Sequence, residues 1–314
     1  MASIIPNGRL VHGMQLPVQS QSRLYAESWE ADAGRDALEA MAVKADKTGF
    51  FYLGVCDHVA IPRPRDTRMG TIWYDTVGTL GWLAGITQRA RLLSHVFNIT
   101  YRHPLLTAKA FTTLDELSGG RIILGMGAGH LEGEFALLGI DFSNRGPAAD
   151  EAIDAIAAAV IDEYPQHSGE LWSFRDAGIA PRPRQARIPI WVGGSSRPAL
   201  RRAAERGDGW LPQGTRRRDM PDAIAYLLEH RKRTRGDEPI DIGAISEVIY
   251  VGDPSWDVGS HTLAGDPEVI AAGLRGFGGM GVSHVQVRFR NRSLQELLDQ
   301  MDAFHDTVAP LLNT

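Results

Sequence analysis

The stretch 121–127, with the sequence RIILGMG, joins a short apolar run to two glycines at alternate positions. Such a run is typical of a strand that is buried on both faces. Before it, Gly119-Gly120 predicts the end of a helix, because glycine accepts the left-handed conformation of a helix C-cap. After it come Ala128, Gly129 and His130. We therefore expect a strand end with bare backbone, which suits a planar ligand, beside a titratable side chain.

Outward from this stretch, apolar runs alternate with segments of helical periodicity along the chain. The expected strands are 12–19, 50–56, 91–99, 121–127, 188–192, 209–211, one within 240–251, and 284–289. The expected helices are 36–47, 75–86, 105–117, 147–164, 198–206, 220–235, 267–277 and 294–311, with an inserted loop or hairpin at 168–184. This order predicts an α/β fold, a single (β/α)8 TIM barrel with insertions over residues 1–314. An open doubly wound sheet is the alternative.

The composition is that of a water-soluble globular protein, with 43% hydrophobic and 23% charged residues among 314. No run approaches the ~18 apolar residues of a membrane span, and the first residues lack the features of a secretory signal. We therefore expect a cytoplasmic protein. The net charge of -5 argues against nucleic acid as the main partner, and the lone Cys56 excludes an internal disulfide. A small molecule is the expected partner.

Polar residues follow several of the predicted strands. In a barrel of this kind the working face lies at the carboxyl ends of the strands. Candidates there are Asp57-His58, Asn98, the segment 127–130, the segment 193–196, and Arg288 or Arg290. His58 is favoured for orienting a ligand or moving a proton, because it follows a buried strand beside an aspartate. A core histidine bonded to backbone is the alternative.

The segment Gly193-Gly194-Ser195-Ser196 joins a buried strand to a helix. Backbone amides, serine hydroxyls and the positive end of the helix dipole would converge there, as a phosphate requires. A plain helix cap by one of the serines is the alternative. The glycines at 125, 127 and 129 differ from a dinucleotide fingerprint, because no following strand ends in an acidic residue.

Taken together, these segments resemble the bacterial luciferase-like family of flavin- and deazaflavin-dependent oxidoreductases. The resemblance covers most of the chain in the right order. The matching segments are 49–50, 56–58, 101–104, 117–121, 125–129, 134–135, 189–196, 203–204 and 208–210.

The resemblance implies a barrel that holds a flavin or deazaflavin ring at the carboxyl ends of the strands, with its phosphate near residues 193–195. Family members often have a non-proline cis peptide in the third strand, which by position is His95-Val96 here. His58 and His130 are the implied catalytic residues. The implied cofactor-binding residues are Asp57, His58, His95, Val96, Asn98, Gly125, Met126, Gly127, Ala128, Gly193, Gly194, Ser195 and Ser196.

The resemblance is strongest to the coenzyme F420-dependent branch, mainly through residues 101–104 and Asp57-His58. It implies hydride transfer between F420 and an unknown small substrate in a homodimer. Some deazaflavin enzymes that act on a sugar phosphate have a glutamate proton donor where this chain has His130, so that acid and that substrate do not carry over. The alternatives are an FMN-dependent monooxygenase fed by a separate flavin reductase, and a non-catalytic flavin-binding protein.

Overall fold

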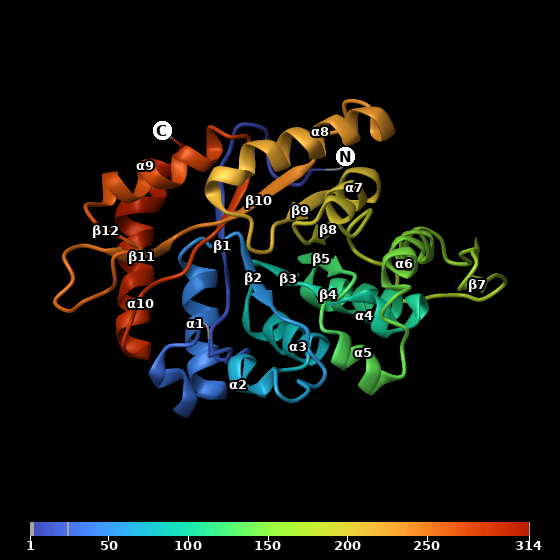
Figure 1. Cartoon of the computed structure of the whole chain (residues 1–314), viewed down its shortest axis with the longest axis horizontal. Helices are drawn as coiled ribbons and strands as arrows, with labels where there is room; N and C mark the ends of the chain where they lie inside the picture. Colours follow the sequence, from blue (N-terminus) through green and yellow to red (C-terminus); the bar gives the residue numbers. More distant parts are fainter. Residues whose placement is uncertain (1–2, 24, 314) are drawn as a thin grey trace.

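Parallel strands at the centre of the molecule close into a barrel (Figure 1). The computed structural model describes residues 3–23 and 25–313. The sheet contains β1 (Val11–Gln15), β2 (Tyr52–Val55), β3 (Arg91–Ser94), β4 (Phe97–Asn98), β5 (Ile122–Gly127), β8 (Ile190–Gly193), β9 (Gly209–Leu211), β10 (Asp241–Ile245) and β13 (His284–Gln286). Their order is β3-β2-β1-β13-β10-β9-β8-β5, and β5 pairs again with β3, while β4 continues the third strand. The predicted closed barrel of eight parallel strands is confirmed, and the open sheet is wrong.

Helices surround the barrel and alternate with its strands. They are α1 (Arg35–Lys47), α3 (Thr76–Ile86), α4 (Pro104–Ser118), α6 (Arg145–Ile161), α7 (Arg197–Arg206), α8 (Met220–Arg235), α9 (Pro267–Gly278) and α10 (Leu294–Ala303). The end of α4 is as predicted, since Gly119 has the left-handed φ of 72° at its C-cap. Among the described residues, no helix has the length and apolar character needed to cross a membrane.

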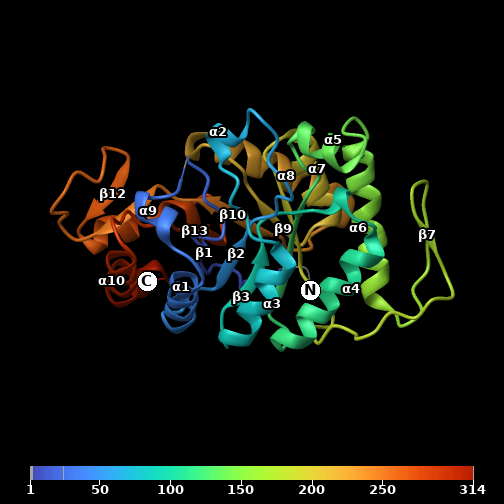
Figure 2. The ribbon, with the colours of Figure 1, turned by 90° about the horizontal axis from the view of Figure 1, so that it is seen from below.

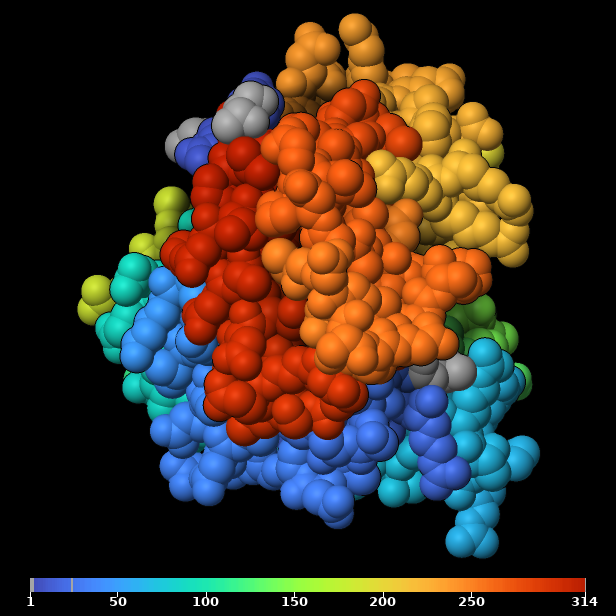
Figure 3. All heavy atoms as spheres, turned by 90° about the vertical axis from the view of Figure 1, so that its left-hand side faces the viewer, coloured from blue at the N-terminus to red at the C-terminus, as the bar shows by residue number. Residues whose placement is uncertain are grey.

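Two insertions lie at opposite edges of the molecule. The strands β6 (His167–Ser168) and β7 (Ser173–Phe174) form an antiparallel hairpin that projects from the barrel (Figure 2). The strands β11 (Val248–Val251) and β12 (Thr262–Gly265) form a parallel pair outside the barrel. This pair and α9 lie beside α10, and together they cover one face (Figure 3). For residues 168–184 we expected an inserted loop or a hairpin, and the structure has the hairpin. For residues 240–251 we expected one strand, the seventh of the barrel, but the structure has both β10 and β11 there.

Three local expectations need correction. The third strand, predicted as continuous over 91–99, is interrupted by a cis peptide at His95-Val96, the position that the resemblance implied. Two short helices, α2 (Asp66–Met69) and α5 (Glu132–Leu138), were not predicted, because so few residues contain too little helical repeat to recognise. The helix expected from 147 begins at Arg145.

Large side chains from three strands fill the middle of the barrel. Trp191 and His284 stack with ring centroids 4.2 Å apart, and Tyr52 meets both rings edge-on. Glycines on neighbouring strands make the room for them. A Cβ at Gly209 would lie 2.3 Å from Trp191, and one at Gly243 would lie 2.5 Å from His284. These contacts are far below van der Waals distance, so packing requires glycine at both positions.

The chain's first described residues close the amino-terminal end of the barrel. Asp241, at the start of β10, is buried and accepts hydrogen bonds from the Ser3 hydroxyl and the amides of Ile4 and Ile5. The indole nitrogen of Trp191 donates to the same carboxylate over 3.2 Å. A ligand that enters the barrel therefore has to approach from the carboxyl ends of the strands.

Replacing Gly125 with alanine should destabilise the barrel strongly. The added Cβ would lie 2.0 Å from the carbonyl oxygen of Ser94, which belongs to the backbone of β3 and cannot rotate away. We expect the free energy of unfolding to fall by about 2 kcal/mol or more, as in overpacked cores. Urea denaturation measures this change.

The control is Gly85→Ala in α3, where nothing lies within 4 Å of the added Cβ. This change should be neutral or should stabilise by up to about 1 kcal/mol, because alanine favours helix. Equal stabilities of the two variants would contradict the packing role of Gly125.

Candidate functional site

The predicted site residues lie where four neighbouring strands end. His58 follows β2, Asn98 ends β4, Gly127 ends β5 and Gly193 ends β8. Because β4 continues β3, which lies between β2 and β5, these strand ends follow one another around the barrel wall. Barrel closure therefore brings four segments that are distant in sequence to one end of the molecule, which we call the mouth.

A buried carboxylate on α5 organises the mouth. One oxygen of Glu134, Oε2, lies 2.9 Å from Nδ1 of His58 and 2.9 Å from the hydroxyl of Tyr101. The other oxygen, Oε1, accepts hydrogen bonds from the amides of Val59 and Ala60. Burial alone would raise the pKa of Glu134, but His58 and the two amides outweigh burial and hold it below its ordinary value. Glu134 is therefore ionised at neutral pH.

The imidazole of His58 is held between this carboxylate and two rings. Trp73 meets it edge-on at 4.5 Å, and the ring of His130 lies 5.7 Å away. His130 is exposed at the rim, yet partial loss of hydration and the neighbouring His58 lower its pKa. The structure thus brings the two predicted catalytic histidines together.

The carboxylate of Asp57 is hydrogen-bonded to other residues of the barrel. It receives both terminal nitrogens of Arg102, at 2.8 and 2.9 Å, together with the amide of Asn98 at 2.8 Å. The side chain of Asn98 donates in turn to the Asp57 carbonyl oxygen. The guanidinium of Arg102 also covers the ring of Phe97. Asp57 thus fastens the end of the third strand to β2, and its contact with a ligand stays a prediction.

The side chain of Val96, after the cis bond, packs against two of the predicted site glycines. A Cβ at Gly193 would lie 2.6 Å from Val96, and one at Gly127 would lie 3.1 Å from it. Gly125 and Met126 are also buried, whereas Ala128 is half-buried. The expectation of bare backbone along this glycine row is therefore wrong for residues 125–127. The glycines let neighbouring strands and side chains approach closely, and their cofactor contacts remain predictions.

The serines before α7 already have hydrogen-bond partners. The Ser196 hydroxyl accepts from the amide of Ala199, so the plain helix cap is confirmed at that residue. The Ser195 hydroxyl bonds the backbone of Gln213, and the Gly194 amide donates to the carbonyl of Leu211 over 3.0 Å. The expectation that the Gly194 amide faces a phosphate is therefore wrong.

Three amides remain available at this helix end. Within the part of the chain that the structure describes, the backbone amides of Ser195, Ser196 and Arg197 have no hydrogen-bond acceptor, and all three residues are exposed. The side chain of Arg197 turns away to cover the ring of Tyr226. An anion at this position would meet three amides and the positive end of a ten-residue helix.

Polar atoms without partners also occur close to the mouth. Nδ1 of His95, Oε1 of Gln286 and Nε1 of Trp73 are buried and have no hydrogen bond to any described residue. His95 follows the third strand and Gln286 ends the eighth. Burial lowers the pKa of His95 to about 4, so its ring is neutral. Buried polar atoms of this kind usually have a partner, which a bound ligand or water would supply.

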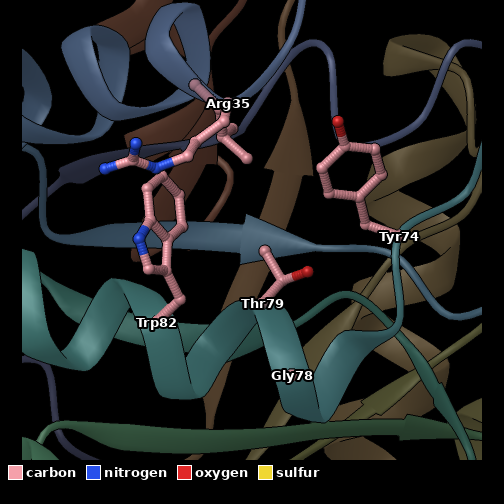
Figure 4. A pocket seen from close by; sticks show the side chains of 6 residues that line it. Arg35, Tyr74, Gly78, Thr79 and Trp82 are labelled. Atoms are coloured by element: carbon pink, nitrogen blue, oxygen red, sulfur yellow. The ribbon is translucent and has the colours of Figure 1, made fainter.

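A separate hollow lies on the outer wall between α1 and α3 (Figure 4). Arg35 and Trp82 reach toward one another across it, beside Tyr74 and Thr79. Among the residues that the structure describes, no histidine or carboxylate lines this hollow. It therefore lacks the imidazole and carboxylate groups that the mouth brings together.

Sequence reasoning gave no role to Glu134, Tyr101, Arg102 or Trp73. The first three lie in segments that carried the family resemblance, which was the only signal available for them. Their importance comes from contacts across 33 to 76 positions of sequence. No local pattern encodes such contacts.

The fold defines a (β/α)8-barrel protein, and its candidate site lies at the carboxyl ends of the strands. The chain belongs to the family described as luciferase-like monooxygenase, whose model matches residues 12–258. This membership confirms the luciferase-like resemblance and places the chain in an oxidoreductase family.

Three known proteins are similar to this chain. An uncharacterized protein of Mycobacterium tuberculosis is 30% identical, over 66% of this chain and 75% of its own length. An F420-dependent glucose-6-phosphate dehydrogenase of Beutenbergia cavernae is 35% identical, over 62% of this chain and 57% of its own length. The crystal structure of the monooxygenase RslO1 from Streptomyces bottropensis has a TM-score of 0.79 at 19% identity, covering 96% of this chain and 99% of its own.

Replacing Asp57 with asparagine should destabilise the protein, because the guanidinium of Arg102 would lose its charged partner. Removing one member of a buried ion pair typically costs about 3 kcal/mol. Chemical denaturation at neutral pH measures the change in free energy of unfolding.

The matched control is Glu229→Gln, which breaks an exposed ion pair with Arg233. The side chain of Glu229 is 67% accessible and that of Arg233 is 59% accessible. Exposed pairs contribute about 0.5 kcal/mol or less. If both variants lost the same small amount, Asp57 would have no special part in holding the mouth.

Proposed function

We propose that this chain transfers a hydride between the deazaflavin coenzyme F420 and a small organic substrate at the mouth of the barrel. The observation that carries the proposal is the placement of His58, bonded to the buried Glu134, at the end of a barrel strand. The 35% identity to an F420-dependent dehydrogenase supports the choice of cofactor. That relative extends beyond the matched part, so its substrate is not transferred to this chain.

The residues at the mouth fit a ring with a phosphorylated tail. In the proposed arrangement Val96 and Asn98 support the ring, and the unpaired polar atoms of His95 and Gln286 lie beside the strand ends. The free amides of residues 195–197 would receive the phosphate. A bound deazaflavin supplies a carbon centre that gives or accepts hydride and does not activate oxygen.

The side chains of the mouth supply acid–base chemistry. Hydride exchange at a carbon that bears oxygen also requires a proton to be moved to or from that oxygen. His58 is the proposed partner for this proton, because an imidazole ring can both accept and donate a proton. His130, on the rim 5.7 Å from His58, is the proposed second member of the path.

An FMN-dependent monooxygenase is the second candidate, favoured by the description of the matching family. It would receive reduced flavin from a separate reductase, and it would use the same mouth. A non-catalytic flavin-binding protein is the third, because this fold can hold a ring without turning it over. A homodimer remains a proposal in all three cases.

Titration of the purified chain with oxidised F420 and, separately, with FMN tests the choice of cofactor. We expect saturable quenching of F420 fluorescence and binding of FMN weaker by at least tenfold, about 1.4 kcal/mol. Tight binding of FMN alone would favour the monooxygenase. Binding of neither would refute the proposed site, and tight F420 binding without turnover of any alcohol or aldehyde would favour a binding protein.

Ser196→Asp tests the position of the phosphate, because Ser196 is the N-cap of α7 and its backbone amide is one of the three free amides. Aspartate is favourable at a helix N-terminus, so the fold should tolerate it, but its charge should repel an anion at the neighbouring amides. We expect the affinity for F420 to fall at least tenfold, measured by the same titration.

Ser293→Asp is the matched control, because Ser293 caps α10 in the same way. Its affinity for F420 should equal that of the wild type. If Ser196→Asp also bound F420 normally, the phosphate would have to lie elsewhere.

A further inference from the structure

We infer that Glu134 is a positioning residue that holds His58 in the tautomer with its proton on Nδ1 and a lone pair on Nε2. The inference deepens the proposed function and rests on it, since it specifies which nitrogen of His58 faces the substrate's proton. Glu134 itself has no exposed surface and does not reach a ligand. It would act only through the ring that it orients.

The hydrogen bonds around Glu134 determine the tautomer. An ionised carboxylate can only accept hydrogen bonds, so the 2.9 Å contact with Oε2 requires a proton on Nδ1 of His58. The hydroxyl of Tyr101 donates to the same oxygen, and burial, together with Glu134, raises the pKa of that hydroxyl. The charges needed for this arrangement are therefore present at neutral pH.

Three separate segments hold the pair in place. The loop after β2 carries His58 and the two amides that bind Oε1, while Tyr101 precedes α4 and Glu134 lies on α5. Trp73 packs edge-on against the imidazole and limits its rotation. The titratable groups facing His58 are Glu134 and His130, with Arg65 close to His130. Among them, only Glu134 bonds to Nδ1.

The consequence is a defined direction for proton transfer. Because Nδ1 donates its proton to the hydrogen bond with Glu134, Nε2 can accept a proton from a substrate hydroxyl. In the reverse direction, a protonated Nε2 can donate its proton to a carbonyl oxygen of the substrate. The arrangement therefore favours substrates that interconvert a hydroxyl and a carbonyl group. A substrate without an oxygen at the reacting carbon would leave Nε2 unused.

Glu134→Gln should reverse the tautomer. The amides of Val59 and Ala60 require an acceptor, so the carboxamide oxygen should take the place of Oε1. The NH2 group would then face Nδ1 of His58 as a donor, which moves the imidazole proton to Nε2. Nitrogen-15 NMR of the full chain without cofactor distinguishes the two nitrogens, and a His58→Gln sample identifies the resonances.

We expect wild-type His58 to carry its proton on Nδ1 at pH 7.5 and the Glu134→Gln variant to carry it on Nε2. F420 affinity should stay within about twofold, whereas kcat for an alcohol substrate should fall roughly 10²–10⁴-fold, the usual contribution of acid–base catalysis. Tyr101→Phe keeps the carboxylate and should leave the tautomer unchanged.

Glu296→Gln is the matched control, because Glu296 accepts hydrogen bonds from Tyr250 and Trp256 away from the mouth. It should alter neither the tautomer nor kcat. A wild-type proton on Nε2 would overturn the inference even if Glu134→Gln did not fold, and so would a folded Glu134→Gln protein with the wild-type tautomer. Failure of F420 to bind would instead refute the proposed function, so the two failures are distinguishable.

Discussion

A closed barrel has a narrow interior, and the side chains that fill it decide how closely its strands can approach. Here Tyr52, Trp191 and His284 occupy the middle layer, and they fit only because neighbouring strands present glycine at the facing positions. The same steric relation recurs at the mouth, where Val96 packs against Gly127 and Gly193. The ends of β4, β5 and β8 are therefore packed closely against one another through Val96.

Buried charge imposes the second constraint. A carboxylate removed from water is tolerated only when hydrogen bonds or opposite charges replace its hydration. Asp57 meets this need with Arg102 and the amide of Asn98, and Glu134 meets it with His58, Tyr101 and two backbone amides. Each carboxylate thereby joins the loop after β2 to a different segment. The hydrogen bonds that these buried carboxylates need therefore both hold the segments of the mouth together and orient His58.

Local physical chemistry was enough for much of the fold. The end of α4 at Gly119 follows from the freedom of glycine, and the alternation of buried strands with amphipathic helices predicted the closed barrel. The family resemblance also located the cis peptide at His95-Val96. Periodicity alone missed the interruption of the strand 91–99, because apolar residues resume directly after Ser94 and His95. The glycine row was interpreted as bare backbone, although Ser94 and Val96 fill the space beside Gly125 and Gly127.

The sequence by itself determined the order of the barrel strands and their helices, and the end of the barrel that carries the polar residues, His58 and His130 among them. Only the tertiary structure decided that Glu134 binds His58, across 76 positions of sequence, and that the amide of Gly194 is used by Leu211. Periodicity reports which face of an element is buried, because that depends on neighbours a few residues away. The partner of a buried polar group depends on which distant segments barrel closure brings beside it.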